Sequence, residues 1–487
     1  MELTKLLNSV NTIQVSGIIE RKDISSIVYD SRKVKKNSLF VAVTGFTTDG
    51  HKFIIDAINK GAVAVILENN NAVPEEIFIH SKVAKILVKD SRAALAEVSD
   101  CFYKNPSSKL SLVGITGTKG KTTTSYFLKN IFETAGYKTG LVGTIANYIA
   151  DRQIYTQLTT PESCDLNELF SEMINENCSH AIMEVSSHSL VLNRVKNLSF
   201  KVAVFTNITS DHLDFHKSFD EYLKAKKILF DSLTEDSVVV FNKDDVSWSK
   251  LIEGTKAKCY SYGKTSGSDF QLDNVHFDLD GTRFTIKHDG KTYNFSTKLI
   301  GEFNAYNAAA SFATSFVLGI KPETIVEGIN STPQVPGRFE TIKKKNKTVI
   351  VDYSHTADSL EKALLALRSI TKNSEPVYTV FGCGGNRDKT KRPVMGKIAS
   401  ELSDHAIITS DNPRFEDPFE IIKEIEAGIS KKNFEVIENR EEAIKRAIDI
   451  SEPNSAILIA GKGHENYQEI KGVRNHFSDK EIAEKYL

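Results

Sequence analysis

The sequence predicts an α/β protein built from three domains. At 487 residues the chain is longer than one hydrophobic core usually organises. Short apolar runs alternate with helical segments over most of its length, which is typical of mostly parallel sheets covered by helices on both faces. Proline-containing joints, Asn105-Pro106 and Pro336-Gly337, interrupt this alternation. We therefore expect domains at residues 1–90, 91–335 and 336–487.

The first domain is expected to be a small α/β unit. Polar turns and one helical stretch, Phe53 to Lys60, separate its apolar runs, and a helix from Ser91 to Tyr103 leads into the second domain. Its expected strands are Ser26 to Tyr29, Leu39 to Val43, Ala62 to Leu67 and Ile86 to Val88.

The second domain is expected to hold a mostly parallel sheet with added hairpins. From Asp269 to Ile300 the pattern changes to period-two alternation, broken at Asp280-Gly281 and Asp289-Gly290, which indicates antiparallel hairpins. An Ala-rich helix, Ala305 to Leu318, follows. The parallel strands are expected at Ser111 to Thr116, Leu141 to Ile145, His180 to Val185, Val202 to Ile208 and Val238 to Asn242.

The third domain is expected to be doubly wound, in the manner of a Rossmann fold, because a new series of strands and helices begins after Pro336-Gly337. Its expected strands are Thr348 to Tyr353, Val377 to Gly382, His405 to Ser410, Phe434 to Ile437 and Ala456 to Ala460.

A glycine-rich turn, Gly117 to Thr123, follows the first strand of the second domain. Its glycines let backbone N–H groups close around phosphate oxygens, Lys121 supplies a positive charge, and Thr122 offers a hydroxyl to Mg²⁺. The turn therefore predicts a site for ATP or GTP. Ile115 stands where the usual G-x-x-x-x-G-K pattern has its first glycine, so the loop belongs to a variant family.

Composition excludes several classes of partner. A formal net charge of -1 gives no reason to expect binding to nucleic acid or to an anionic membrane. The five cysteines include no C-x-x-C pair, and Met1-Glu2-Leu3-Thr4 opens no signal peptide, so we expect free thiols in a cytoplasmic protein. The apolar runs are far shorter than the roughly 18 residues of a membrane span. We expect a monomer.

Polar clusters follow two strands of the second domain, at Glu184 to His188 and at Thr206 to His216. Both would lie at strand ends beside the phosphate loop, where a carboxylate and an imidazole can hold Mg²⁺, although this ion prefers oxygen ligands. Further on, Glu221 to Lys227 lies on an expected helix and is by composition only a basic face.

Three turns of the third domain follow its strands, at Gly382 to Asp388, Asp411 to Arg414 and Gly461 to Glu465. In a parallel sheet they would meet at one edge. Their arginines can bind carboxylates and Glu465 can receive an ammonium group. Together they suit a zwitterionic amino acid.

These motifs give the chain a resemblance to the Mur ligases over essentially its whole length. The segments that match are Tyr29-Asp30-Ser31-Arg32, Gly117 to Thr123, Thr159-Thr160-Pro161, Glu184 to His188, Asp211-His212-Leu213-Asp214, Gly301-Glu302-Phe303-Asn304, Pro336-Gly337-Arg338, Asp352-Tyr353-Ser354-His355 and Asp411-Asn412-Pro413-Arg414.

The resemblance implies four sets of site residues. The ATP set is Gly117, Thr118, Lys119, Gly120, Lys121, Thr122, Thr123, Asn304, Arg338, Asp352 and His355. The set for UDP-MurNAc-L-Ala-D-Glu is Tyr29, Ser31, Phe46, Thr47, Thr48, Thr159, Thr160, Ser186 and Arg194. The set for meso-diaminopimelate is Arg387, Asp411, Asn412, Pro413, Arg414, Gly461 and Glu465. The Mg²⁺ set is Thr122, Glu184, His212 and Lys226, of which Lys226 would react with CO₂ to become a carbamate.

The implied reaction is ATP-driven amide formation for peptidoglycan synthesis, with Lys121, Lys226, Glu184 and His212 as catalytic residues. The D-glutamate carboxylate takes the γ-phosphoryl group, and the amine of diaminopimelate then attacks the acyl phosphate. Closure of the third domain would assemble the site and exclude water.

Three alternatives stay open at this point. The added amino acid could be L-lysine, and a folate polyglutamate ligase would share the phosphate loop and the amide chemistry. A GTPase switch would explain Asn242-Lys243-Asp244-Asp245, which matches the guanine-reading N-K-x-D pattern. However, no D-x-x-G lies between the phosphate loop and Asn242, where a switch protein needs it.

Overall fold

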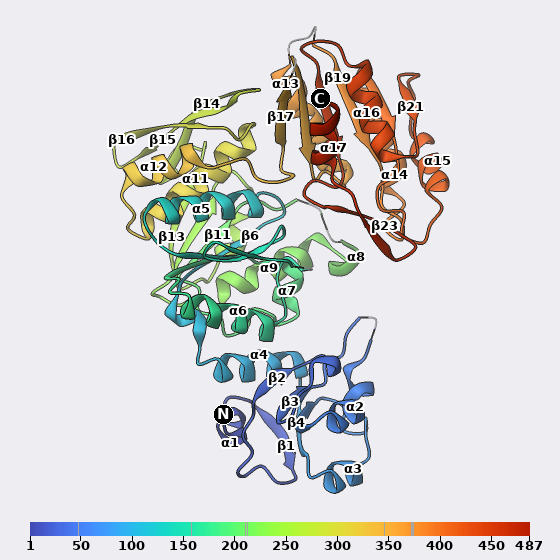
Figure 1. Cartoon of the computed structure of the whole chain (residues 1–487). Coiled ribbons are helices and arrows are strands. Elements are labelled where there is room, and N and C mark those ends of the chain that lie inside the picture. Colours follow the sequence, from blue (N-terminus) through green and yellow to red (C-terminus); the bar gives the residue numbers. More distant parts are fainter. Residues whose placement is uncertain (47, 157, 210, 212, 345, 372–374) are drawn as a thin grey trace. The chain divides into compact units, whose positions relative to one another are not determined.

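The structure is a computed structural model that describes the chain except residues 47, 157, 210, 212, 345 and 372–374 and the side chains of residues 213 and 214. The chain divides into two compact units, one of Met1–Gln271 with Asn307–Gly328 and one of Leu272–Tyr306 with Ile329–Leu487. Three large sheets, of five, eleven and six strands, confirm the predicted three-domain α/β class (Figure 1).

The N-terminal region of the first unit is a five-stranded sheet with the order β1-β5-β4-β3-β2. Only β1 runs antiparallel to its neighbour, and the inner strands are almost completely buried because both faces are covered. The elements are α1 (Leu3–Leu7), β1 (Thr12–Ser16), β2 (Ser26–Val28), η1 (Ser31–Lys33), β3 (Ser38–Val41), η2 (Gly50–Phe53), α2 (Ile54–Asn59), β4 (Ala62–Leu67), α3 (Glu75–His80), β5 (Ala84–Val88) and α4 (Ser91–Phe102).

The largest sheet has β6 at the centre of its parallel part, between β11 and β10, so the loop after β6 lies among several strand ends. The first unit holds its strands in the order β13-β12-β11-β6-β10-β7-β8-β9. They and the neighbouring elements are η3 (Pro106–Lys109), β6 (Ser111–Thr116), α5 (Lys121–Thr134), β7 (Thr139–Val142), β8 (Asn147–Ile149), β9 (Arg152–Ile154), α6 (Ser163–Asn175), β10 (His180–Glu184), α7 (Ser187–Val191), β11 (Val202–Phe205), α8 (Leu213–His216), α9 (Phe219–Asp231), β12 (Val238–Asn242), α10 (Trp248–Ile252) and β13 (Lys258–Gly263).

The strand β14 pairs with β13 through Phe270 and Gln271 and then continues into the second unit. There β15 and β16 form the antiparallel hairpin that Asp289-Gly290 predicted. The remaining elements of this stretch are β14 (Phe270–Asp278), β15 (Gly281–His288), β16 (Lys291–Thr297), α11 (Glu302–Val317) and α12 (Pro322–Ser331).

The six-stranded sheet of the second unit has the order β17-β18-β22-β19-β20-β21, in which only β17 is antiparallel. Parallel pairing brings the ends of β19, β20 and β22 to one edge, as the sequence predicted. The elements are β17 (Glu340–Lys344), β18 (Lys347–Asp352), α13 (Ala357–Ile370), β19 (Val377–Phe381), α14 (Lys391–Leu402), β20 (His405–Ile408), α15 (Pro418–Glu426), β21 (Phe434–Val436), α16 (Arg440–Ile450), β22 (Ala456–Ala460), β23 (Tyr467–Ile470), β24 (Val473–His476) and α17 (Asp479–Tyr486).

Within the described part of the chain, no helix combines the length and the apolar character needed to cross a membrane. All five cysteines are free thiols.

Candidate active site

The phosphate loop joins β6 to α5 and needs glycine at two positions. Gly117 has a φ of 152°, and a Cβ there would lie 1.9 Å from Thr206 Oγ1. Gly120 has a φ of 87°, and its Cβ would lie 2.4 Å from Asn307 Oδ1. The loop is therefore packed closely enough that only hydrogen fits at either Cα.

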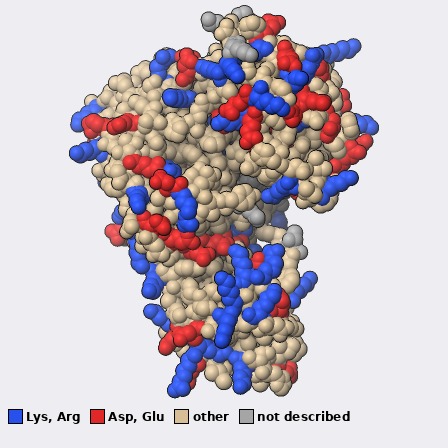
Figure 2. All heavy atoms as spheres, in the orientation of Figure 1, with Lys and Arg blue, Asp and Glu red and all other residues tan. Residues whose placement is uncertain are grey.

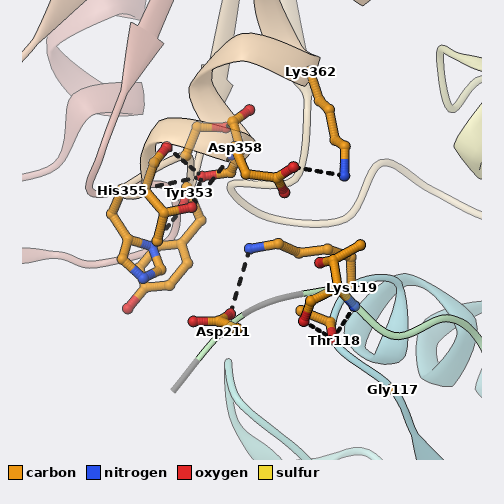
Figure 3. A network of polar contacts seen from close by, with 12 residues as sticks. Gly117, Thr118, Lys119, Asp211, Tyr353, His355, Asp358 and Lys362 are labelled. Atoms are coloured by element: carbon orange, nitrogen blue, oxygen red, sulfur yellow. Dashed lines mark hydrogen bonds and ion pairs between the residues drawn. The ribbon is translucent and has the colours of Figure 1, made fainter. Parts of the chain in front are cut away.

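The segment after β11 fastens this loop from the side. Asn207 O accepts a hydrogen bond from Thr118 N at 2.8 Å, and Asn207 Oδ1 accepts one from Lys119 N at 3.0 Å. Thr206 Oγ1 donates to Lys119 O at 2.7 Å. Figure 3 shows Lys119 extending toward Asp211, with 3.9 Å between Nζ and Oδ2. The loop thus has a fixed conformation before any phosphate binds.

Two lysines converge on one carbonyl of the loop. Lys121 Nζ donates to Gly117 O at 2.8 Å and to Thr118 O at 3.0 Å. Lys226 Nζ, from the middle of α9, donates to the same Gly117 O at 2.9 Å and lies 4.5 Å from the centre of the Tyr222 ring. Basic side chains that gather at one carbonyl of the loop suit an anionic ligand.

Lys226 is 1 % exposed. Burial, together with the nearby charge of Lys121, lowers its pKa well below the ordinary value, although Asp211 opposes the shift. The composition of this segment predicted only a basic helix face, and it was the resemblance to the Mur ligases that pointed to Lys226. Its burial is what distinguishes it from Lys224 and Lys227 on the same helix, which form ion pairs with Glu221 and Asp231.

Glu184 ends β10 beside the loop and is 1 % exposed. Thr122 Oγ1 donates to Glu184 Oε2 at 3.0 Å. Thr144 donates to both oxygens of this carboxylate, from N to Oε1 and from Oγ1 to Oε2, each at 2.9 Å. These donors fix the carboxylate at the start of α5. The sequence predicted Glu184 and Thr122 as neighbours, but it did not identify Thr144.

The residues around the loop fit Mg²⁺ by the chemistry of their donors. A threonine hydroxyl and a buried carboxylate are oxygen ligands, and Mg²⁺ typically takes one or two carboxylates together with phosphate oxygens and water. Among the described residues, no group of three or more His, Cys, Asp or Glu side chains is arranged to hold a metal without such additional ligands. His212, the fourth residue of the expected set, lies outside the described residues.

Four of the residues expected to bind the muramoyl-dipeptide lie in one network around the end of β10. Thr160 Oγ1 donates to Glu184 O at 2.8 Å and accepts from Ser186 N at 3.1 Å. Arg194 Nη1 donates to Thr160 O at 3.1 Å, and Thr159 Oγ1 lies 3.1 Å from Thr144 Oγ1. The network therefore places these side chains next to Glu184.

The residues expected to bind the uridine end have different local environments. Tyr29 OH donates to Asp165 Oδ2 at 2.5 Å, and burial beside that carboxylate raises the pKa of the phenol. Ser31 is buried at the start of η1, followed by exposed basic residues at 32, 33, 35 and 36. Figure 2 shows Lys and Arg gathered on one face of this N-terminal region. Phe46 is 72 % exposed and Thr48 is also exposed, while Thr47 lies outside the described residues.

Four residues of the expected ATP set lie in the second unit. Asn304 Nδ2 donates to Ile300 O at 2.8 Å, and Asp352 Oδ2 accepts from Phe339 N at 2.8 Å. The guanidinium of Arg338 lies 4.7 Å from the centre of the Tyr353 ring. His355 packs against the same ring, with 4.6 Å between centroids (Figure 3). Tyr353 was not among the expected site residues, although it lies within one of the matching motifs.

The three turns of the second unit meet as predicted. Arg414 has a φ of 52°, and its Nη1 donates to Gly385 O at 2.8 Å, while its Nε lies 4.0 Å from Glu469 Oε2. A Cβ at Gly384 would lie 3.0 Å from Arg414 Nη1 and 3.9 Å from Arg387 Cγ, so both arginines border this glycine turn. A surface pair between Arg414 and Glu416 is not present, because Glu416 binds Arg392 instead, at 3.0 Å.

A buried charge cluster lies beneath Arg414. Lys462 is fully buried, and its Nζ lies 3.3 Å from Asp411 Oδ1, 2.9 Å from Asn412 Oδ1 and 3.7 Å from Glu465 Oε2. Asn412 Nδ2 donates to Glu465 Oε2 at 2.9 Å. Burial and the charge of Asp411 raise the pKa of Glu465. Lys462 was quoted in the sequence only as part of a glycine turn, and its role became visible from contacts about fifty residues away along the chain.

Three side chains of the N-K-x-D segment make structural hydrogen bonds. Asn242 Nδ2 donates to Thr206 O at 2.9 Å, and Asp245 Oδ2 accepts from Ile208 N at 2.7 Å. Asp244 accepts hydrogen bonds from the backbone N–H groups of Lys264 and Thr265. Asn242 and Asp245 thus hold the loop after β11, which itself fastens the phosphate loop, and Asp244 holds the turn after β13, so a guanine-reading role is not needed to explain them.

Comparisons with known proteins agree with this architecture. The Mur ligase family catalytic domain matches residues 23–103, the Mur ligase middle domain matches 115–315, and the Mur ligase glutamate ligase domain matches 337–463. The fold and the phosphate-loop site thus define the class of protein: the chain belongs to the Mur ligase family.

Within that family, several similar proteins carry the same name. UDP-N-acetylmuramoyl-L-alanyl-D-glutamate–2,6-diaminopimelate ligase of Cytophaga hutchinsonii is 45% identical over 491 residues, which cover 100% of this chain and 99% of that protein. The enzyme of Clostridium acetobutylicum named as ligase 1 of this type is 43% identical, with the same coverage. A solved structure of a ligase with this name has a TM-score of 0.71 at 28% identity and covers 100% of this chain and 98% of its own.

Proposed function

We propose that this protein is an ATP-dependent ligase that joins meso-diaminopimelate to the D-glutamate carboxylate of UDP-MurNAc-L-Ala-D-Glu. The product would be the UDP-linked tripeptide used in peptidoglycan synthesis. Support comes from relatives of this name that match the chain along its whole length. The observation that supports the choice of amino acid is the arrangement of Arg414 over a buried cluster rich in carboxylates.

The first unit supplies the groups for phosphoryl transfer. Lys121 would leave the Gly117 and Thr118 carbonyls and neutralise the γ-phosphoryl oxygens, while the loop N–H groups cradle the other phosphates. Mg²⁺ would be held by Thr122 and Glu184, with His212 as a further expected ligand, and when bound it would draw charge from the transferring group. The D-glutamate carboxylate attacks phosphorus, ADP leaves, and an acyl phosphate results.

Lys226 is suited to form a carbamate. Its lowered pKa favours the neutral amine, which has the lone pair that attacks the carbon of CO₂. The new N–C bond forms as the neutral amine loses one proton, which leaves a carbamate whose carboxylate group carries a negative charge. That carboxylate would add an oxygen ligand for Mg²⁺ near Gly117, where the lysine now donates to a carbonyl.

The second unit supplies the amino-acid site. An α-amino acid with a second carboxylate and ammonium at its far end needs both a cation and an anionic pocket. Arg414, with Arg387 beside it, would bind the far carboxylate, and Glu465 with Asn412 and Asp411 would bind the far ammonium. Lysine lacks the far carboxylate, so it would leave Arg414 without its ligand.

The UDP-muramoyl-dipeptide would bind along the first unit. The basic residues after Ser31 suit the diphosphate, and Thr159, Thr160, Ser186 and Arg194 would orient the peptide. We also propose that Asn304, Arg338, Asp352 and His355 contribute to ATP binding, and that the domains divide near residues 90 and 335. Further proposals are a cytoplasmic location and a monomeric state.

The decisive test is phosphate release by the purified protein with ATP, Mg²⁺ and UDP-MurNAc-L-Ala-D-Glu, with one amino acid added at a time. We expect turnover with meso-diaminopimelate and much less with L-lysine. Turnover that prefers lysine would assign the alternative ligase, and turnover with glutamate on a folate acceptor would assign the more distant one. Replacing ATP by GTP should abolish activity.

A further inference from the structure

A buried ion pair connects the last helix of the chain to the amino-acid site. Arg440 and Asp479 are the first residues of α16 and α17, and their side chains are fully buried. Arg440 Nε and Nη2 donate to the two oxygens of Asp479 at 2.7 and 2.8 Å. This bidentate geometry fixes the plane of the guanidinium.

The same guanidinium reaches the end of β22. Arg440 Nη2 donates to Ala460 O at 3.0 Å, one residue before Gly461, whose N donates to Asp352 O at 3.1 Å. Gly461 has a φ of 121°, and a Cβ there would lie 3.6 Å from Asp411 Oδ2 and 3.9 Å from Arg440 Nη2. The ion pair and the site residue Asp411 therefore flank one glycine.

The charges around this glycine form one electrostatic unit. Its carboxylates are Asp411, Glu465 and Asp479, and its cations are Lys462 and Arg440, which leaves one carboxylate in excess. Burial alone would raise the pKa of Asp411, but Lys462 and Arg440 more than offset it and the pKa is lowered. Arg440 Nη1 has no hydrogen-bond partner in the structure, so the guanidinium is not saturated by the contacts that hold it.

We propose that Arg440 and Asp479 are positioning residues for the amino-acid site. The pair fixes the backbone turn at Gly461, and Asp479 prevents the buried guanidinium from neutralising Asp411 and Glu465, so that their negative charge remains for the ammonium group of the ligand. This inference rests on the proposed function and extends it to the C-terminal helix, which supplies no expected site residue.

The test compares KM values for the three substrates in Asp479→Asn. The variant removes one negative charge and leaves Arg440 to pair with Asp411. We expect the KM for meso-diaminopimelate to rise about tenfold or more, while the KM values for ATP and for UDP-MurNAc-L-Ala-D-Glu stay within about twofold. The double variant Arg440→Gln/Asp479→Asn removes the pair and restores the excess carboxylate, so its KM for diaminopimelate should return to within about threefold of the parent.

Glu435→Gln is the matched control. Glu435, in β21, forms a bidentate pair at the surface with Arg446, which lies on α16 like Arg440, and the two contacts measure 3.0 and 2.9 Å. It should change none of the three KM values. If Asp479→Asn does not fold, Asp479→Ser supplies the test, since it removes the same negative charge and leaves the contact between Arg440 and Ala460 O in place; the same selective rise in KM is expected.

A purely structural role would give a different result. A lower melting temperature with an unchanged KM for diaminopimelate, or an equal rise in all three KM values, would overturn the inference. So would a double variant as impaired in this KM as the single one. Absence of diaminopimelate turnover in the parent protein would instead overturn the proposed function itself.

Discussion

The phosphate loop of the first unit and the amino-acid turns of the second use the same architecture for opposite charges. Both lie at the ends of parallel strands, and both rely on glycines that bring backbone and side chains close together. Around the loop, the charged side chains described above are three lysines, 119, 121 and 226, against Glu184 and Asp211. In the buried cluster at the turns, the carboxylates Asp411, Glu465 and Asp479 outnumber the cations Lys462 and Arg440, while Arg387 and Arg414 border the turn at Gly384.

The difference identifies the ligand of each region. A cluster of lysines is satisfied by a polyanion, as ATP is, whereas an excess of buried carboxylates is satisfied by an ammonium group. Each region is incomplete in charge without its own ligand. Changes that alter the charge of one region should therefore affect the substrate of that region first.

The largest expected effect is that of Lys121→Ala. The variant removes a charge that acts as negative charge develops on the phosphoryl oxygens, so kcat should fall by roughly a thousandfold or more. Its melting temperature should stay near that of the parent, because Thr206 and Asn207 hold the loop through hydrogen bonds that do not involve Lys121. Steady-state kinetics and a thermal melt check this.

Lys129→Ala is the matched control for Lys121→Ala, since Lys129 lies on the same helix and pairs with Glu133. It should leave kcat unchanged. A Lys121→Ala protein that turns over at a rate close to that of the parent would remove Lys121 from the mechanism.

The second prediction concerns the carbamate. Lys226→Ala should reduce kcat by about two to three orders of magnitude through the lost oxygen ligand, and acetate or formate should partly restore activity by supplying one. Lys224→Ala, an exposed lysine of α9, should have no such effect. Incubation of the parent with ¹³C-labelled bicarbonate should give a carbamate carbon signal that Lys226→Ala lacks. A spectrum without that difference would contradict the assignment.

The third prediction tests the choice of amino acid. Arg414→Ala should lower kcat/KM for meso-diaminopimelate by about a hundredfold, because the bidentate contact with the far carboxylate is lost. This is below the effect of a fully buried pair, because the Arg414 side chain is 22 % exposed and solvent screens part of the interaction. Activity with lysine, which has no far carboxylate, should change much less. An equal decline for both amino acids would show that Arg414 only supports the fold of the turn.

Much of the fold could be predicted from the sequence, and particular elements show why. The strands β4, β6, β12 and β22 occupy the predicted residues, because continuous apolar runs between polar turns are typical of buried parallel strands. The edge strand β1 was missed, since Ile13 and Val15 are exposed and the segment has no buried face to give a periodic pattern. The helix α5 begins at Lys121, inside the turn expected at Gly117 to Thr123, because its polar first turn is buried in the site and hides the amphipathic period.

The site was predictable where local sequence determines it. The phosphate loop and the three turns follow strands directly, so their positions come with the strands. Lys462, Arg440 and Asp479 were missed because Arg440 and Asp479 lie 39 residues apart, Lys462 lies 51 residues from Asp411, and a charged residue is usually exposed. No spacing rule identifies a buried ion pair between the first turns of two helices. Such contacts depend on how the helices pack on the sheet.

The smallest expected effect is a pH dependence, and it separates the two regions most finely. Burial and the charge of Asp411 raise the pKa of Glu465 above that of an ordinary glutamate, while Lys462 and Asn412 oppose the shift. Only the ionised carboxylate attracts the ammonium group of the amino acid, so acidification should raise the KM for diaminopimelate at a higher pH than an ordinary glutamate would, by up to about tenfold per pH unit.

Acidification has the opposite effect on the stability that Glu465 contributes. A carboxyl whose pKa is raised by folding binds its proton more tightly in the folded state. The contribution of Glu465 to the free energy of unfolding therefore grows as pH falls through the folded pKa. Acidification should therefore weaken amino-acid binding without a loss of stability from this group.

In Glu465→Gln the KM for diaminopimelate should be high and nearly constant over the same pH range. The KM for ATP should not follow this titration in either protein, because the loop that would bind the phosphates, with Lys121, belongs to the other region. A KM for ATP that follows the same pKa would show that the two regions do not respond separately to charge, and the comparison between them would fail.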